Sequence, residues 1–262
     1  MRVLNILRIA AITITTVIVT GCYSFPEKID EMAGWTNQEL YLEARNAFTS
    51  SDWSRCSKYF KLLEERDPFG SFAQQAQINI PYCQWKDNEK EAAKQSADRF
   101  IQLYPDHPDI AYVYYLKGLI GFNNDQSLLD YFIAQNIVEY DPEMLHNAYD
   151  SFRIIVEKYP RSKYALDATQ RMRYIANVLA EHEVNTADYY YRRGAYVAAI
   201  NRAQIVLKKY KNTTATEDAL HIMVLAYRKL QQKQLADDAQ RVLILTFPDS
   251  VYVTGRTHTL SK

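Results

Sequence analysis

Side chains that could bind a metal or transfer protons are few and scattered in this sequence. The histidines are His107, His146, His182, His221 and His258, and none lies three to five residues from another histidine or a cysteine. Common zinc sites need ligands at such short spacings. The sequence therefore predicts no metal site, and no glycine-rich motif indicates a bound cofactor.

Catalytic motifs are also missing from the chain. It contains no G-x-S-x-G nucleophile elbow and no phosphate-binding P-loop. Glu181-His182-Glu183 places two acids beside a histidine. Neighbouring residues in a helix point in different directions, so a solvated helix face is the favoured interpretation. Because catalysis needs a positioned nucleophile, acid–base pair or metal, we predict no catalytic residues and no enzymatic activity.

Cys22 has the sequence context of a cysteine that is covalently modified. Arg2 and Arg8 precede an uncharged, mostly apolar run over 9–19, which is too short to span a bilayer. Val19-Thr20-Gly21-Cys22 follows and resembles the lipobox of bacterial lipoproteins. We therefore predict a signal peptide over 1–21, with lipid attachment at Cys22. The alternative is an ordinary signal peptide that happens to contain a cysteine.

The predicted anchor indicates where the protein lies. Several acyl chains hold a protein stably on a membrane, because each buried CH₂ contributes roughly 0.8 kcal/mol. Tyr23 follows the cysteine, and by resemblance to enteric lipoproteins the absence of Asp there permits sorting to the outer membrane. Residues 22–36 form a polar tether containing Pro26 and Gly34. We expect a lipid-anchored protein on the periplasmic face of the outer membrane.

Composition narrows the fold and the range of partners. The chain has 31 basic and 31 acidic residues, and loss of 1–21 removes only two arginines. This balance argues against nucleic-acid binding, which needs a basic face. Only 7 glycines and 8 prolines occur in 262 residues. This scarcity disfavours an all-β fold, which needs many turns.

A repeat emerges from the points at which helical patterns end. Small residues lie twelve positions before the second residue of each ending, as in the second helix of a tetratricopeptide repeat. The endings are Asp67-Pro68, Tyr104-Pro105, Tyr159-Pro160, Tyr210-Lys211 and Phe247-Pro248. The small residues are Cys56, Ala93, Ala148, Ala199 and Ala236. A small residue at this register lets two helices approach closely.

The endings are unevenly spaced, which predicts two long repeats. They are 37, 55, 51 and 37 residues apart, against about 34 in an ideal repeat. The third repeat then has an insertion over about 122–143. The fourth has a long helix that Ser162 could cap and that runs to about Arg193. We expect this helix to join the two parts of the chain as a spine.

These features predict an all-α tetratricopeptide-repeat superhelix of about five helix pairs. Repeats one to three occupy 37–161, repeats four and five occupy 162–250, and a tail follows over 251–262. Cys56 and Cys83 remain after acylation of Cys22. The cell envelope is oxidising, so a disulfide is one alternative. The small-residue position of Cys56 favours a buried free thiol instead.

Specific stretches of sequence resemble the BamD (ComL) family of outer membrane lipoproteins. They include the proline-phenylalanine-glycine block at 66–75, the segment 98–101, the segment 164–168 and the arginine-glycine block at 193–202. The resemblance covers about 37–250. One departure is the segment 134–140 in the third-repeat insertion, which is largely uncharged where relatives carry acids and arginines. Lys211 in place of proline is a lesser departure.

The resemblance implies a scaffold subunit of the β-barrel assembly (BAM) complex at the outer membrane. Its expected partners are a BamA-like barrel protein, contacted through a POTRA domain, lipoproteins like BamC and BamE, and unfolded outer membrane proteins. The N-terminal repeats would bind the targeting signals of those unfolded proteins, and the C-terminal repeats would dock on BamA. The uncharged insertion leaves its contacts with BamC or substrate open. A competing interpretation is a repeat lipoprotein that coordinates peptidoglycan or other envelope assembly.

Five residues carry these binding expectations. Arg202 matches the arginine with which the family contacts BamA, and Asn201 precedes it. Arg202 lies beside the buried stripe of its helix, so its guanidinium should reach the surface. Phe69, Gly70 and Phe72 form the candidate substrate pocket, with Gly70 permitting a sharp bend. If one ring instead packs between repeats, we expect it to be Phe69 rather than Phe72.

Overall fold

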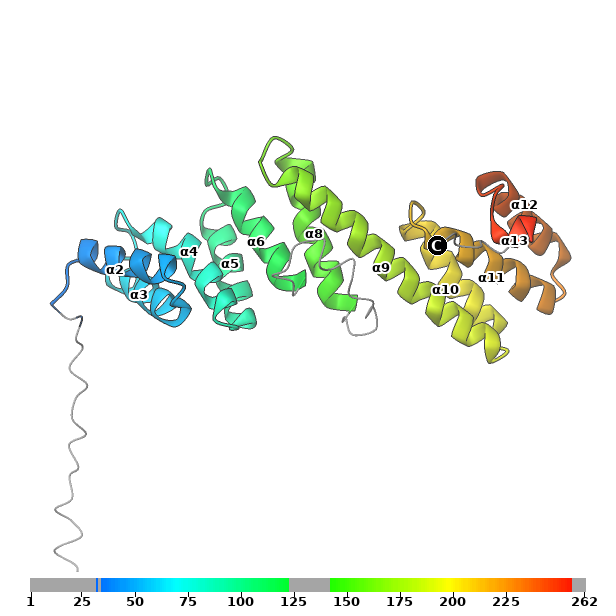
Figure 1. Ribbon diagram of the computed structural model, residues 1–262, viewed down its shortest axis with the longest axis horizontal. Coiled ribbons are helices and arrows are strands. Elements are labelled where there is room, and N and C mark those ends of the chain that lie inside the picture. The colour runs from blue at the N-terminus through cyan, green and yellow to red at the C-terminus, as the bar shows by residue number, and fades with distance from the viewer. Residues whose placement is uncertain (1–31, 33, 123–141, 256–262) are drawn as a thin grey trace, which may run out of the picture.

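The computed structural model describes residues 32, 34–122 and 142–255, and this part of the chain is entirely helical (Figure 1). It holds eleven α-helices and no strand, which confirms the all-α prediction. The first six helices are α2 (Asn37–Thr49), α3 (Trp53–Arg66), α4 (Ala73–Lys86), α5 (Lys90–Leu103), α6 (Ile110–Phe122) and α8 (Pro142–Lys158). The others are α9 (Ala165–Arg192), α10 (Tyr196–Lys209), α11 (Ala215–Lys229), α12 (Lys233–Thr246) and α13 (Val251–Thr254).

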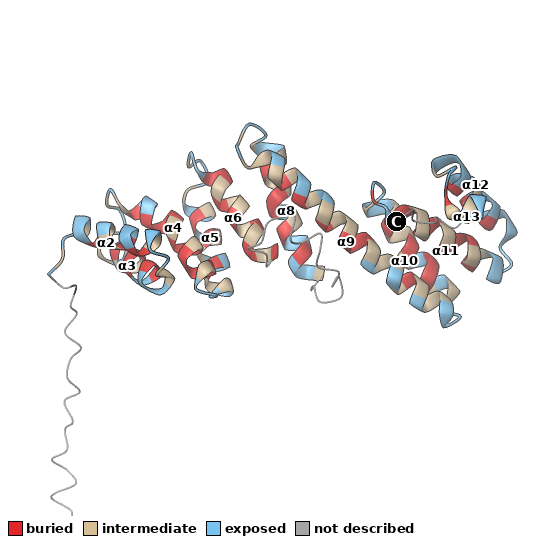
Figure 2. Ribbon diagram, viewed as in Figure 1, coloured by how far each residue is buried: buried red, intermediate tan, exposed pale blue. Residues whose placement is uncertain are grey.

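Consecutive helices pack in antiparallel pairs and form an elongated rod (Figure 1). The pairs are α2 with α3, α4 with α5, α6 with α8, α9 with α10, and α11 with α12. Buried residues lie where the helices meet, and exposed residues cover the outside (Figure 2). The small residues that marked the repeat are at most 1% exposed, so the predicted register is confirmed.

The turn inside a repeat also recurs with a fixed geometry. Ser51, Asn88, Gly194 and Gln231 have φ between 58° and 77°, and each lies five residues before a small residue of the register. A left-handed residue is a common way to end a helix, because it turns the chain while satisfying the last carbonyls. Three of the four are not glycine, so the turn is imposed by the packing of the pair.

Turns between repeats share one hydrogen-bond pattern. A backbone N–H donates to the carbonyl three residues earlier, from Gly70 to Asp67, His107 to Tyr104, Ser162 to Tyr159, Thr213 to Tyr210 and Ser250 to Phe247. Lys211 in place of proline does not alter the turn. Ser162 belongs to this turn, and α9 begins three residues later with Tyr164 at its N-cap. The expectation that Ser162 caps the helix was therefore wrong.

Helix α9 is the predicted spine of the molecule. Its 28 residues span about 42 Å at 1.5 Å per residue. Ile175 and Leu179 pack in the core of α6 and α8, while Ala180 and Ala187 pack in the core of α10 and α11. One continuous helix thus contributes to two successive cores. The insertion of the third repeat falls at 123–141, outside the described residues.

The two remaining cysteines form a disulfide. Cys56 of α3 and Cys83 of α4 are bonded, fully buried, and 5.9 Å apart at their Cα atoms. The prediction that favoured a free thiol was wrong. A small-residue position is where a neighbouring helix comes closest, and this distance lies within the range that a disulfide can bridge. The close approach of α3 and α4 that buries Cys56 also brings Cys83 within bonding distance.

Candidate functional site

Arg202 lies on α10, and its guanidinium is held by a residue of the same chain. Its Nη1 lies 3.2 Å from Oε2 of Glu183 on α9. The arginine side chain is 42% exposed and the glutamate side chain 16%. Asn201 beside it is exposed. The guanidinium of Arg202 therefore reaches the surface, as expected, but it is paired with the more deeply buried carboxylate of Glu183.

The same pair corrects one expectation about α9. Glu181, His182 and Glu183 do point in different directions, and His182 is exposed. Glu183, however, is largely buried and paired rather than solvated. Burial raises the pKa of Glu181, and Asp218 raises it further. This stretch is a helix face covered partly by α10 and α11, which the sequence alone does not reveal.

The two phenylalanines proposed for the substrate pocket have different surroundings in the structure. Phe69 is 97% exposed in the turn between α3 and α4. Phe72 packs against the first core, with its ring stacked on Tyr41 at 4.7 Å between centroids and 22° between planes. The expectation that Phe69 would be the packed ring was wrong. Phe72 points into the core because it directly precedes the first buried residue of α4, whereas Phe69 lies at the tip of the turn.

Gly70 leaves room for a neighbouring carboxylate and does not adopt an unusual backbone angle. Its φ is not positive, but a Cβ at this position would overlap the carboxylate of Asp67. That carboxylate accepts a hydrogen bond from Asn37 Nδ2 at 3.3 Å. The turn therefore folds tightly around an acid, and Gly70 supplies space without contributing a side chain to a pocket.

A cleft that no sequence pattern predicted lies beside the spine helix α9. It is lined by α8, α9 and the turn between α10 and α11, with a volume of about 640 Å³. Among the residues that the structure describes, three basic ones line the cleft, Arg173, Lys209 and Lys211, and no acidic one does. Its residues come from segments up to 64 positions apart, from Tyr149 to Thr213. Only the packing of two repeats creates this site.

Comparison with known proteins decides the family of this chain. A family model described as outer membrane lipoprotein (YfiO) matches residues 34–243. The outer membrane protein assembly factor BamD of Neisseria meningitidis serogroup B is 42% identical over 219 residues, covering 84% of this chain and 82% of the relative. The chain belongs to the BamD family. BamD of Xylella fastidiosa is 34% identical over 95% of this chain and 85% of its own length, and BamD of Vibrio cholerae is 33% identical over 80% and 86%.

Membership of the BamD family confirms the resemblance seen in the sequence. Its relatives are named outer membrane protein assembly factors, and the family description associates it with the outer membrane. Within the described residues, no helix is both long enough and apolar enough to cross a membrane. The same part of the chain contains no cluster of three His, Cys, Asp or Glu side chains that could hold a metal ion.

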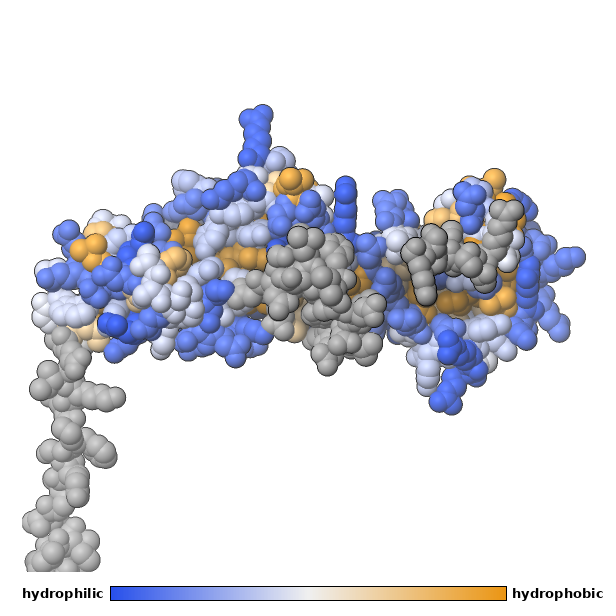
Figure 3. All heavy atoms as spheres, viewed as in Figure 1, coloured by the Kyte–Doolittle hydropathy of each residue, from blue (hydrophilic) through white to orange (hydrophobic). Residues whose placement is uncertain are grey.

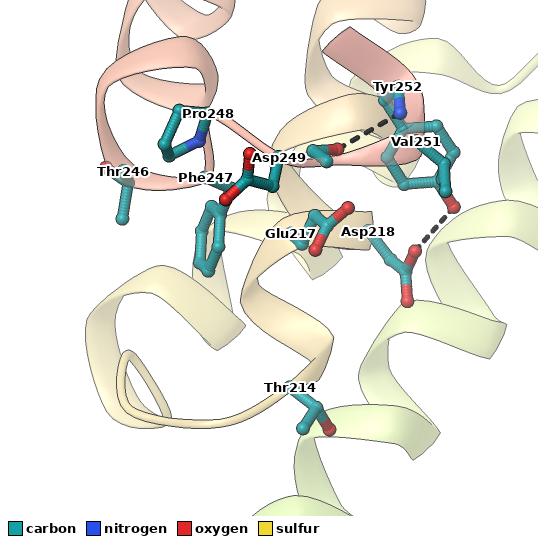
Figure 4. Close-up of a pocket in the computed structure, with 10 residues that line it drawn as sticks. Thr214, Glu217, Asp218, Thr246, Phe247, Pro248, Asp249, Val251 and Tyr252 are labelled. Atoms are coloured by element: carbon teal, nitrogen blue, oxygen red, sulfur yellow. Dashed lines mark hydrogen bonds between the residues drawn. The ribbon is translucent and has the colours of Figure 1, made fainter. Parts of the chain in front are cut away.

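A second pocket lies at the C-terminal end of this BamD-family chain (Figure 4). It has a volume of about 540 Å³, and its charged lining residues are Glu217, Asp218 and Asp249. The Tyr252 hydroxyl donates to Asp218 Oδ1 at 2.5 Å, which ties α13 to α11. This hydrogen bond, burial and the nearby acids raise the pKa of Tyr252 to about 12. The pocket is thus a structural junction with an acidic surface.

Proposed function

We propose that this protein is the scaffold subunit of a β-barrel assembly complex and performs no chemistry of its own. It would bind a BamA-like barrel protein through a POTRA domain, and the targeting signals of unfolded outer membrane proteins. The observation that carries the proposal is the family match, which extends over nearly all the helical repeats. Lipoproteins like BamC and BamE are further proposed partners. The name of the relatives favours this role over coordination of peptidoglycan.

The C-terminal repeats, over 162–250, are proposed to dock the barrel protein. Terminal repeats of solenoid proteins normally carry a polar outer face. On α12, Leu235, Val242 and Leu245 share one face and are 43%, 49% and 76% exposed. Hydrophilic residues cover much of the visible surface of the rod, with smaller hydrophobic patches between them (Figure 3). The exposed leucines and Arg202 on the neighbouring pair support a protein interface at this end.

The N-terminal repeats, over 37–161, are proposed to receive the unfolded substrate. An almost fully exposed aromatic ring can stack on the rings of a partner that ends in an apolar, aromatic strand. Phe69 offers such a ring at the tip of the first inter-repeat turn. Acylation of Cys22 is proposed to hold the whole rod on the periplasmic face of the outer membrane.

Substitutions of Arg202 and of its internal partner Glu183 test the docking proposal. Arg202→Leu should weaken binding to the BamA-like protein by roughly 2–5 kcal/mol if the arginine pairs with a buried carboxylate of the partner. Arg202→Lys should rescue only in part, because lysine cannot form a bidentate pair. Glu183→Gln removes the internal ion pair but leaves the guanidinium in place, so it should retain the partner. Co-purification from membranes and titration of the isolated POTRA domain measure these effects.

Stability is the control in this experiment. Arg202→Leu leaves the 16%-exposed carboxylate of Glu183 unpaired, so it should cost about 1–3 kcal/mol of folding free energy. Glu183→Gln leaves only the half-exposed guanidinium unpaired, so it should cost no more than about 1 kcal/mol. Equal loss of partner in Arg202→Leu and Glu183→Gln would assign the arginine an internal structural role. Wild-type recovery of the partner with Arg202→Leu would rule out the proposed interface.

A further inference from the structure

The basic cleft beside α9 carries an uncompensated positive charge. Arg173 of α9, Lys209 at the end of α10 and Lys211 in the following turn line it, and all three are exposed. No ion pair holds the three cleft residues within the described part of the chain. The cleft therefore attracts a negatively charged group from outside it.

An apolar floor lies beneath the charged rim. Val156 of α8 and Met172 of α9 line the cleft and pack against the core between these helices. Methionine adapts its shape to different apolar groups. Asn212 adds an exposed amide at the rim, where it can pair with a peptide backbone. A volume of about 640 Å³ is within the range of ligand pockets and accommodates several side chains.

The cleft is continuous with the face that bears Arg202. Lys209 lies seven residues after Arg202 on α10, so the two side chains project from the same side of that helix. Tyr210 follows Lys209, lines the cleft, and packs against both of the cores that α9 joins. A molecule bound over Arg202 can therefore extend into the cleft.

We propose that this cleft binds an acidic peptide segment that carries an apolar side chain, supplied by the same protein that docks over Arg202. Carboxylates would pair with the three basic residues, and the apolar side chain would cover Val156 and Met172. A peptide fits better than a lipid headgroup because the site combines an apolar floor with an amide rim. The identity of the partner rests on the proposed function, whereas the chemistry of the ligand rests on the cleft alone.

A charge reversal in the cleft tests the proposal. The probe is a short fluorescein-labelled peptide of glutamates around one phenylalanine, titrated into the full mature chain by fluorescence anisotropy. Arg173→Glu with Lys211→Glu should weaken binding at least about tenfold. The matched control is Arg45→Glu with Lys58→Glu, which changes net charge equally at exposed positions of α2 and α3. A probe with glutamine in place of glutamate should bind poorly to every variant.

A second measurement identifies the natural occupant. Asn212→p-benzoylphenylalanine in the purified complex should cross-link to a segment of the barrel partner that is rich in Asp and Glu. If the double reversal does not fold, Lys211→Gln in the exposed turn replaces it and should weaken the probe by a smaller factor. Circular dichroism establishes folding for each variant.

Each outcome decides the proposal. Equal probe affinity in the cleft and control variants overturns it. Vesicles of phosphatidylglycerol that bind in a cleft-dependent manner, without binding of the peptide, also overturn it and assign the cleft to a membrane. Peptide binding that depends on the cleft upholds it. If the barrel protein then fails to co-purify with wild-type chain, the proposed function falls while the peptide site stands.

Discussion

Phe69 and Phe72 lie three residues apart, yet their side chains meet different surroundings. Phe69 is almost fully exposed, while Phe72 stacks on Tyr41 and packs against the first core. Phe69→Ala should therefore leave thermal stability unchanged and weaken binding of a C-terminal barrel peptide. Phe72→Ala should lower the free energy of unfolding by about 2 kcal/mol, through lost burial and stacking. Thermal denaturation and peptide titration of the two variants measure both effects.

The two aromatic variants serve as controls for each other. Loss of peptide binding in Phe69→Ala at constant stability assigns the exposed ring to the substrate. Unchanged peptide affinity in Phe69→Ala would remove this turn from the binding site, whatever Phe72→Ala does.

His221 should make stability depend on pH. Its ring lies 3.9 Å from that of Tyr252 and nearly parallel to it. Burial lowers the pKa of His221 below its ordinary value of 6.5, Asp218 opposes this shift, and Arg228 adds to it. Below pH 6.5 the unfolded chain therefore binds more protons than the folded chain, and stability falls as pH decreases. Above that pH the contribution is fully present.

The measurement compares wild type with His221→Gln across this range. Between about pH 7.5 and 5.5, the wild-type midpoint of thermal unfolding should fall further than that of the variant. Parallel curves would show that His221 does not contribute to the pH dependence of stability. Glutamine is the suitable substitution because it retains polarity and does not titrate.

At the scale of elements, the close contact between α6 and α8 depends on Gly118, which has no side chain. A Cβ on Gly118 would lie 2.5 Å from Cε1 of Phe152, which is fully buried. Gly118→Ala should therefore lower the free energy of unfolding by about 1–3 kcal/mol, as overpacking does. Gly121 on the same helix is the matched control, because its Cβ would meet only ordinary contacts at 3.5 Å and beyond.

Gly121→Ala should leave stability unchanged or raise it by up to about 1 kcal/mol, since alanine favours helix more than glycine. Urea denaturation of both variants tests the pair. Equal effects at the two positions would mean that helix propensity, rather than the approach of α6 to α8, controls this part of the rod.

At the scale of the whole molecule, acylation of Cys22 is the proposed attachment of the rod to the outer membrane. Cys22→Ala should then abolish acylation and leave the precursor or a soluble periplasmic form. Fractionation at high salt, which removes electrostatic binding, measures this. A variant that still sediments with outer membranes would show that the lipid is not the main anchor.

Much of the fold follows from the sequence read in order. The spacing of helix endings and small residues located the second helix of every repeat, because each such helix buries one stripe against its neighbours. The long helix of the fourth repeat was visible as an unbroken pattern. The start of α9 was misplaced, since Ser162 has the side chain of a cap but occupies a turn position shared by all the repeats.

The binding surfaces required the tertiary structure, because they depend on residues that are distant in sequence. The sequence and the family resemblance indicated Arg202 and the proline-phenylalanine-glycine turn. Which ring is exposed, and which acid holds the arginine, depends on the neighbouring helices. Cys56 and Cys83 pair because α3 and α4 approach closely, although 27 residues separate them. Local spacing determines which faces of a helix are apolar, but only packing determines which side chains from different helices meet.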